Sequence, residues 1–168
     1  RDCRQSFPWG HEDGWSLEAL DTTGETLAEL IDYQGNTVAP CSLGLSRNEL
    51  GGRVAVSGYY AMCDLLFQSK LTQLKRLFRY LSGDTLSAWV ESYHRIGLFV
   101  RDSGAVSLVH ASLDPARDAV VAIRTGRRDL VLTDQWMNTF PVTESGRDGG
   151  YGYYRLPELQ PWHVYLLN

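Results

Sequence analysis

The second half of the chain alternates short apolar segments with turn residues, and this pattern constrains the fold more than any other feature. After residue 86, the turn sequences Asp102-Ser-Gly, Asp114-Pro and Thr125-Gly separate runs rich in Val, Leu, Ile and Tyr. The strands predicted from these runs cover residues 88–93, 95–101, 105–113, 119–124, 130–133, 151–156 and 162–167. Short strands at such spacing are typical of antiparallel sandwiches. We therefore expect residues 86–168 to form an antiparallel β-sandwich.

The first half combines a weaker strand pattern with one helix. Strand-like alternation occurs at residues 15–19, 27–33 and 52–59. Residues 1–85 are therefore expected to form a β-rich α/β module that ends in the helix. Together the two halves predict a mainly β chain of the α+β class with a single amphipathic helix.

The helix is predicted at residues 69–81. Apolar residues recur there at steps of three and four and share one stripe: Phe67, Leu71, Leu74, Phe78 and Leu81. Ser69 is a suitable N-cap, and Gly83 can adopt the left-handed conformation that ends a helix. We expect the apolar stripe to pack on a sheet.

Length and composition indicate a folded, soluble chain. The 168 residues fit one ordinary domain or two very small ones, with 43% hydrophobic and 21% charged residues. No apolar run approaches the ~20 residues that a membrane-spanning helix needs. The net charge is −4 and the 16 Lys and Arg residues are scattered. Neither a membrane nor a nucleic acid is therefore expected as a partner.

The cysteines Cys3, Cys41 and Cys63 are too few and too irregularly spaced to indicate a disulfide scaffold or a zinc site. A reducing, cytoplasmic compartment is slightly favoured, although one disulfide and one free thiol would fit the same count. The chain has neither an initiator Met nor an apolar signal core. We expect such a start in a chain that begins inside a longer parent protein.

No complete catalytic constellation is evident, so no catalytic residue, metal site or cofactor is predicted. Ser46 lies in Gly44-Leu-Ser-Arg-Asn, which lacks the second glycine of a nucleophile elbow. Cys63 also lacks flanking glycines and is expected to be a buried thiol. His11-Glu-Asp13 is interpreted as a polar turn, because metal-site spacing is absent.

Two further histidines, His110 and His163, alternate with apolar neighbours inside predicted strands and are expected to face the surface. Cleavage of glycosides needs two carboxyl groups that flank the bond. Their separation is set by the fold, and no carboxyl group of this sequence has a distinguishing context. The acidic residues therefore predict no glycosidase site.

Residues 138–150 are rich in Gly, Thr, Ser and charge and are predicted to form a long exposed loop. Five candidate sugar-binding residues surround this segment: Trp136, Asn138, Tyr151, Tyr153 and Tyr154. Sugars present apolar C–H faces that stack on exposed rings, and amide groups can bind their hydroxyls. The alternative interpretation is that these rings fill the sandwich core and cover its edge.

Four segments resemble a known group of proteins. The sequence Leu50-Gly-Gly-Arg-Val-Ala-Val-Ser-Gly-Tyr-Tyr and the helix at 70–82 resemble non-catalytic regions near the end of bacterial glycoside-hydrolase-like proteins. These include relatives of β-galactosidases with a glutamine-amidotransferase-like domain. Residues 108–114 and 156–167 resemble their closing β-sandwich. The resemblance covers residues 50–168, and its motifs are structural.

This resemblance implies that the catalytic carboxylates lie in an upstream barrel outside the chain. The chain itself would then support assembly, stability or substrate access. Two alternatives remain open: a free-standing carbohydrate-binding module, and a ligand-free structural or oligomerisation domain. A further alternative is that the chain is an enzyme whose catalytic residues the sequence does not reveal. The partners expected are accordingly a carbohydrate ligand, an upstream catalytic domain or a second copy of the chain.

Overall fold

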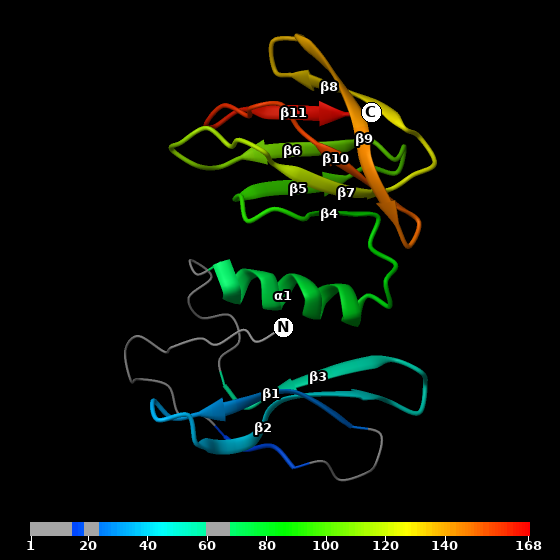
Figure 1. Cartoon of the computed structure of the whole chain (residues 1–168). Helices are drawn as coiled ribbons and strands as arrows, with labels where there is room; N and C mark the ends of the chain where they lie inside the picture. The colour runs from blue at the N-terminus through cyan, green and yellow to red at the C-terminus, as the bar shows by residue number, and fades with distance from the viewer. Residues whose placement is uncertain (1–14, 19–23, 60–67) are drawn as a thin grey trace. The chain divides into compact units, whose positions relative to one another are not determined.

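The computed structural model describes residues 15–18, 24–59 and 68–168, with the side chains of residues 68 and 69 excepted (Figure 1). By its internal contacts the chain divides into two compact units, Arg1–Thr85 and Leu86–Asn168. We call them unit 1 and unit 2 and describe each by itself. The described chain is mainly β with one helix, and its sheets are antiparallel. The predicted fold class is thus confirmed.

Unit 1 contains a three-stranded antiparallel sheet in the order β1-β2-β3. Its strands are β1 (Glu25–Ile31), β2 (Thr37–Arg47) and β3 (Arg53–Ser57). The eleven-residue β2 lies in the middle and pairs with both neighbours. Strand β2 was not predicted, because Pro40, Ser42 and Gly44 interrupt its apolar pattern.

The helix α1 (Gln68–Leu81) packs on this sheet, as predicted. Leu74 and Leu77 are buried against Leu45 of β2 and against Ala55 of β3. Phe78, which was assigned to the apolar stripe, is instead 50% exposed. The helix therefore turns its Leu77 side to the sheet.

Both the end and the beginning of α1 carry informative residues. Gly83 has a φ of 68° and follows the last turn, which confirms its predicted role at the helix end. Lys70 in the first turn is buried, and its Nζ lies 4.3 Å from the centroid of the Tyr59 ring. Lys70 is thus buried although it is not part of the predicted apolar stripe.

Residues 15–18 run beside the sheet without forming a strand, although alternation predicts one there. The Trp15 amide donates to the Gly58 carbonyl, and the Leu17 amide donates to the Cys41 carbonyl, both at 2.7 Å. A Cβ atom on Gly58 would lie 2.1 Å from the Trp15 carbonyl oxygen. Only glycine therefore permits this close approach.

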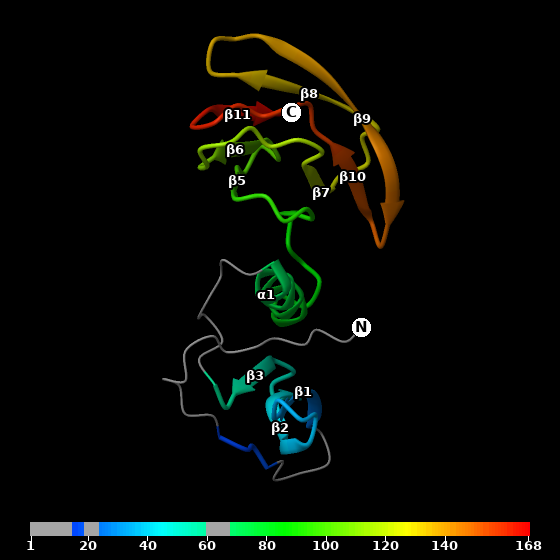
Figure 2. The ribbon, with the colours of Figure 1, turned by 60° about the vertical axis from the view of Figure 1, so that its left-hand side comes forward.

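Unit 2 is a single eight-stranded antiparallel sheet in the order β4-β7-β10-β9-β8-β11-β6-β5. The strands are β4 (Ala88–Val90), β5 (Ile96–Val100), β6 (Val106–His110), β7 (Val120–Arg124), β8 (Asp129–Asp134), β9 (Thr139–Asp148), β10 (Tyr151–Arg155) and β11 (Val164–Leu167). The two ends of the sheet are consecutive strands that contact each other. The sheet thus curls into a sandwich-like, nearly closed barrel, with β9 curving along one side (Figure 2).

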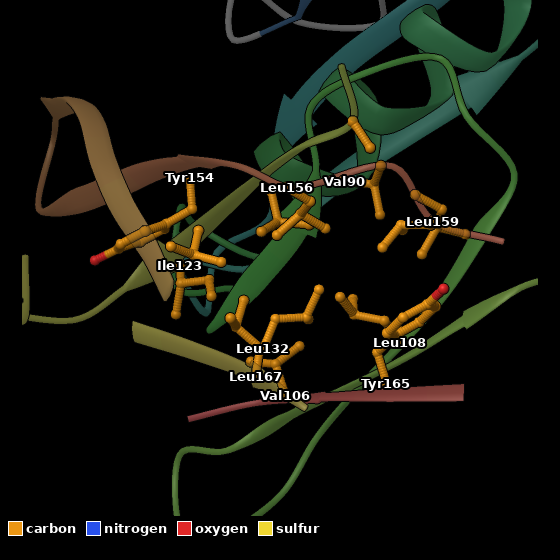
Figure 3. Close-up of a cluster of buried hydrophobic side chains, with 14 of the residues drawn as sticks. Val90, Val106, Leu108, Ile123, Leu132, Tyr154, Leu156, Leu159, Tyr165 and Leu167 are labelled. Carbon is orange, nitrogen blue, oxygen red and sulfur yellow. The ribbon is translucent and has the colours of Figure 1, made fainter. Parts of the chain in front are cut away.

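One hydrophobic core fills the inside of this barrel. Side chains from most of the strands and from the segment after β10 converge there, including Val106, Leu108, Leu132, Tyr154 and Leu159 (Figure 3). These five side chains are at most 1% exposed. Alternate residues of β6 point inward, as expected for a strand with one buried face.

The prediction of a long exposed loop at residues 138–150 is wrong, because most of this segment forms strand β9. The strand pairs with β8 on one side and with β10 on the other, so its backbone is hydrogen-bonded along both edges. Only Val142 of its side chains is buried. The polar composition therefore reflects an outward-facing strand whose sheet neighbours determine its conformation.

Candidate functional site

The five predicted sugar-binding residues lie at separate places along β9, with Tyr151 paired to Asp148 at its end and Tyr154 paired to Glu144 in its middle. Trp136 and Asn138 belong to the turn that precedes this strand, whereas the three tyrosines belong to β10, which follows it. A ten-residue strand spans about 30 Å at ~3.3 Å per residue. The structure therefore does not bring all five residues to one platform.

Tyr151 and Tyr154 are at most 1% exposed and offer no free ring face. The Tyr151 hydroxyl donates to the Leu86 carbonyl at 2.7 Å and accepts from Arg124, whose guanidinium also lies over the ring. The Tyr154 hydroxyl donates to the Arg127 carbonyl, and burial raises the pKa of this phenol. Both side chains thus hold β10 to neighbouring segments.

Tyr153 is half-buried on the outer face of the barrel. Its ring centroid lies 6.5 Å from that of Trp89, and both residues pair with Ala122 of the intervening strand β7. The Trp89 indole N–H in turn donates to Glu91 at 2.6 Å. These contacts make Tyr153 part of a packed aromatic pair.

Trp136 is the predicted residue that presents a large exposed ring, at 61% of its surface. It lies in the turn Asp134–Asn138, whose backbone is fixed by the Asp134 carboxylate. One oxygen of this carboxylate accepts from the Trp136 amide at 2.9 Å and from the Asn138 amide at 2.8 Å. The other accepts from the Asn138 side chain at 2.8 Å. Asn138 is therefore a structural partner of Asp134 in the turn.

These hydrogen bonds also affect the acidity of Asp134. Desolvation raises its pKa, but the hydrogen bonds from Asn138 and Trp136 and the nearby His163 together outweigh it. The pKa of Asp134 consequently lies below its ordinary value of 3.8. The carboxyl group is ionised at neutral pH, so the turn carries a negative charge.

The Trp136 ring packs against His163, which precedes β11. Their ring centroids are 4.4 Å apart at an angle of 61°. The Nδ1 atom of His163 lies 2.7 Å from the Pro161 carbonyl oxygen, which makes Nδ1 the protonated nitrogen. The Gln135 side chain accepts from the Val164 amide at 3.3 Å and links the same two segments. Trp136 is therefore exposed but held in place.

Two more apolar side chains extend this surface. Met137 follows Trp136 and is 79% exposed, while Trp162 precedes His163 and is 64% exposed. Tyr165 of β11 pairs with Asp134 of β8. We define the tip cluster as Trp136, Met137, Trp162 and His163, which come from these two neighbouring segments.

His110 supports the segment that carries the tip cluster. The prediction that it faces the surface is wrong, because it is 2% exposed and points into the barrel. Its Nε2 lies 2.8 Å from the Asp114 carbonyl oxygen. The His110 carbonyl accepts from the Trp162 amide, and the His110 amide donates to the His163 carbonyl. The backbone of β6 thus fixes both aromatic residues.

The other sequence candidates form no comparable arrangement in the described part of the chain. Residues 15–18, 24–59 and 68–168 contain no cluster of His, Cys, Asp and Glu suited to a metal ion. Cys41 is a free thiol. Cys3, Cys63 and the cluster at residues 11–13 lie outside the described residues.

Sequence reasoning missed three members of the tip cluster: Met137, Trp162 and His163. A signal for the turn was present, because Asp134 and Asn138 repeat the spacing of Asp32 and Asn36. The packing of His163 on Trp136 depends on the pairing of β11 with β8, which local sequence does not indicate.

Comparisons with protein-family models, with curated proteins and with solved structures find no match to this chain. Within the described residues, no helix has the length and apolar character needed to cross a membrane. The tip cluster is therefore the feature of the described residues from which a function is proposed.

Proposed function

We propose that this chain is a non-catalytic accessory region of a carbohydrate-active enzyme and that it contacts carbohydrate through the tip cluster. The observation that carries the proposal is the Trp136 ring, which is 61% exposed yet packed against His163 at 4.4 Å. The resemblance of residues 50–168 to the closing region of glycoside-hydrolase-like proteins supports the same conclusion.

An exposed ring of this kind suits the C–H face of a sugar. Stacking removes apolar surface of both partners from water, while the sugar hydroxyls remain free to meet water or polar side chains. A ring that is already oriented loses less conformational entropy when it binds. Because Trp136 is held by Asp134 through its amide and by His163 through its ring, little ordering remains to be done.

Isothermal titration calorimetry of the intact chain against a panel of soluble oligosaccharides tests this proposal. The variant Trp136→Ala should lose binding, and Trp15→Ala is a matched control because Trp15 is 68% exposed in unit 1. Loss of binding in Trp136→Ala alone would support the proposal. Absence of binding by the unchanged chain, or equal affinity in both variants, would contradict it.

A second candidate function is self-association through unit 1. Its sheet carries exposed apolar side chains on all three strands: Leu27 at 48%, Val38 at 68% and Val56 at 49%. Analytical ultracentrifugation separates the two candidates. A concentration-dependent dimer that Val38→Lys dissociates would favour association, whereas a monomer at all concentrations would exclude it.

A further inference from the structure

Four turns of the described chain share one backbone pattern. In each five-residue segment the first amide donates to the last carbonyl, and the fourth amide donates to the first carbonyl, at 2.8 to 3.0 Å. The segments are 32–36, 48–52, 101–105 and 134–138. This pattern is the three-residue hairpin loop, whose fourth position adopts the left-handed conformation.

Three of these turns have glycine at the left-handed position, and the fourth does not. Gly35, Gly51 and Gly104 have φ values of 88°, 80° and 82°. Met137 occupies the same position in the turn 134–138 with a φ of 70°. A residue with a Cβ atom is disfavoured in this conformation, so the backbone at Met137 is strained.

Trp162 shows the same combination of strain and exposure. Its φ is 59°, and 64% of its surface is exposed. The other non-glycine residues with positive φ in the described chain are Asp84 and Asp118. Aspartate tolerates this conformation better than a bulky apolar residue does. Met137 and Trp162 therefore stand out as the two bulky apolar residues held in left-handed backbone.

Packing within unit 2 does not explain why Met137 and Trp162 adopt a positive φ, since both side chains point largely into solvent. Strained residues persist where the surrounding structure enforces them, and they concentrate at functional sites. Here the Asp134 carboxylate enforces the conformation of the Met137 turn, and the hydrogen bond to His110 holds Trp162.

The two residues also belong to segments that contact each other. Strand β11 pairs with β8 through Tyr165 and Asp134. Beyond this pair, the Gln135 side chain accepts a hydrogen bond from the Val164 amide, and the rings of Trp136 and His163 are in contact. Met137 follows Trp136 and Trp162 precedes His163, so the two residues flank this ring contact in the sequence.

Charge restricts the ligand that such a surface accepts. The two segments, Asp134–Asn138 and Pro161–Val164, contain one carboxylate and no Lys or Arg. That carboxylate is occupied by the turn, where it accepts three hydrogen bonds. An anionic ligand would be repelled by it, whereas a neutral sugar would meet the apolar side chains without this repulsion.

We infer that Met137 and Trp162 contact ligand in the same site as Trp136, and that this site takes a neutral oligosaccharide through its apolar C–H faces. The inference rests on the proposed carbohydrate function and adds two contact residues and the class of ligand. It also explains why the turn lacks the glycine found in the other three.

The test measures oligosaccharide affinity and thermal stability of Met137→Gly and Trp162→Asn in the intact chain. Both replacements suit a left-handed position, so the fold is retained. Each should weaken the binding of a neutral gluco-oligosaccharide about tenfold, while Met137→Gly raises the melting temperature. Tyr33→Ala is the matched control, because Tyr33 is a 94% exposed aromatic residue of the turn 32–36.

A uronic-acid oligosaccharide of equal length distinguishes the ligand class and should bind about threefold more weakly at low salt. Unchanged affinity in both variants, together with loss of binding in Trp136→Ala, would overturn the inference and leave the proposed function intact. Equal affinity for the uronic-acid ligand would overturn the ligand class. Absence of saccharide binding by the unchanged chain would overturn both proposals.

Discussion

The turns at residues 32–36 and 134–138 are built by the same hydrogen bonds but present different side chains. In each, an Asp carboxylate accepts from two backbone amides and from an Asn side chain, at 2.8 to 2.9 Å. The loop of the first is Tyr33-Gln-Gly35, and the loop of the second is Gln135-Trp-Met137. The same Asp and Asn frame therefore supports both turns, while the three loop residues differ.

The two loops differ in backbone strain and in how their aromatic side chain is packed. Gly35 adopts its φ of 88° without strain, whereas Met137 adopts 70° with it. Tyr33 is 94% exposed, while Trp136 is packed on His163 from a neighbouring segment. The turn 32–36 therefore connects its strands without backbone strain. The turn 134–138 is strained at Met137 and presents an oriented apolar surface.

The largest effect is expected from exchanging one loop for the other. The triple variant Gln135→Tyr, Trp136→Gln, Met137→Gly should lose oligosaccharide binding, because it removes two contact side chains. Its free energy of unfolding should change little, because glycine relieves the strain while the Gln135–Val164 hydrogen bond and the Trp136–His163 contact are lost. Calorimetric titration and chemical denaturation measure the two quantities. Retained binding would show that the loop residues are irrelevant to the ligand.

Reciprocal single substitutions sharpen the comparison of stability. Gly35→Met should lower the free energy of unfolding by about 1 kcal/mol, and Met137→Gly should raise it by about the same amount. The signs are opposite because the two positions share one backbone conformation. Urea denaturation followed by circular dichroism provides the values. A decrease in both variants would mean that Met137 makes a stabilising contact.

A smaller and equal effect is expected from Asn36→Ala and Asn138→Ala. Each removes one side-chain hydrogen bond to an exposed carboxylate, at 2.9 Å in the first turn and 2.8 Å in the second. The expected loss is about 0.5 kcal/mol of unfolding free energy in each variant. A much larger loss in Asn138→Ala would reveal an additional role for that residue, such as holding the tip cluster.

The smallest effect concerns acid stability. The Asn36 side chain lowers the pKa of Asp32; at Asp134, desolvation acts the other way but is outweighed by hydrogen bonds. A lowered folded-state pKa contributes stability above the unfolded value, and this contribution disappears as pH falls through the folded value. Both contributions should therefore be lost below pH 3.8. Carboxyl chemical shifts in an NMR titration should place both midpoints below that value.

Sequence patterns predicted the strands of unit 2 well where buried residues alternate. Residues 105–113 were assigned from apolar alternation, and β6 is found at 106–110 with Val106 and Leu108 inside. Strand β9 escaped this reasoning, because Val142 is its one buried side chain and Gly146 and Pro141 are typical of loops. The conformation of β9 is determined by its hydrogen bonds to the two neighbouring strands, β8 and β10. A local sequence pattern does not show which strands will be neighbours in the sheet.

The candidate site was predicted in part. Trp136 was singled out because of its residue type, and its exposure agrees with a binding role that remains a prediction. Tyr151 and Tyr154 were grouped with it because they flank the same segment, yet they fill buried positions of the unit. A loop would have allowed both ends to meet, whereas the strand β9 separates them. His163 joins Trp136 through sheet pairing alone.

The indole N–H signals of the tryptophans test the central claim most directly. The chain has five tryptophans, and each indole N–H contributes one cross-peak to a proton–nitrogen NMR spectrum. Titration with a neutral oligosaccharide should shift the Trp136 and Trp162 signals together and leave those of Trp15 and Trp89 unchanged. Shifts confined to Trp15 or Trp89, or no shift at saturating ligand, would contradict the assignment of the tip cluster as a sugar-binding surface.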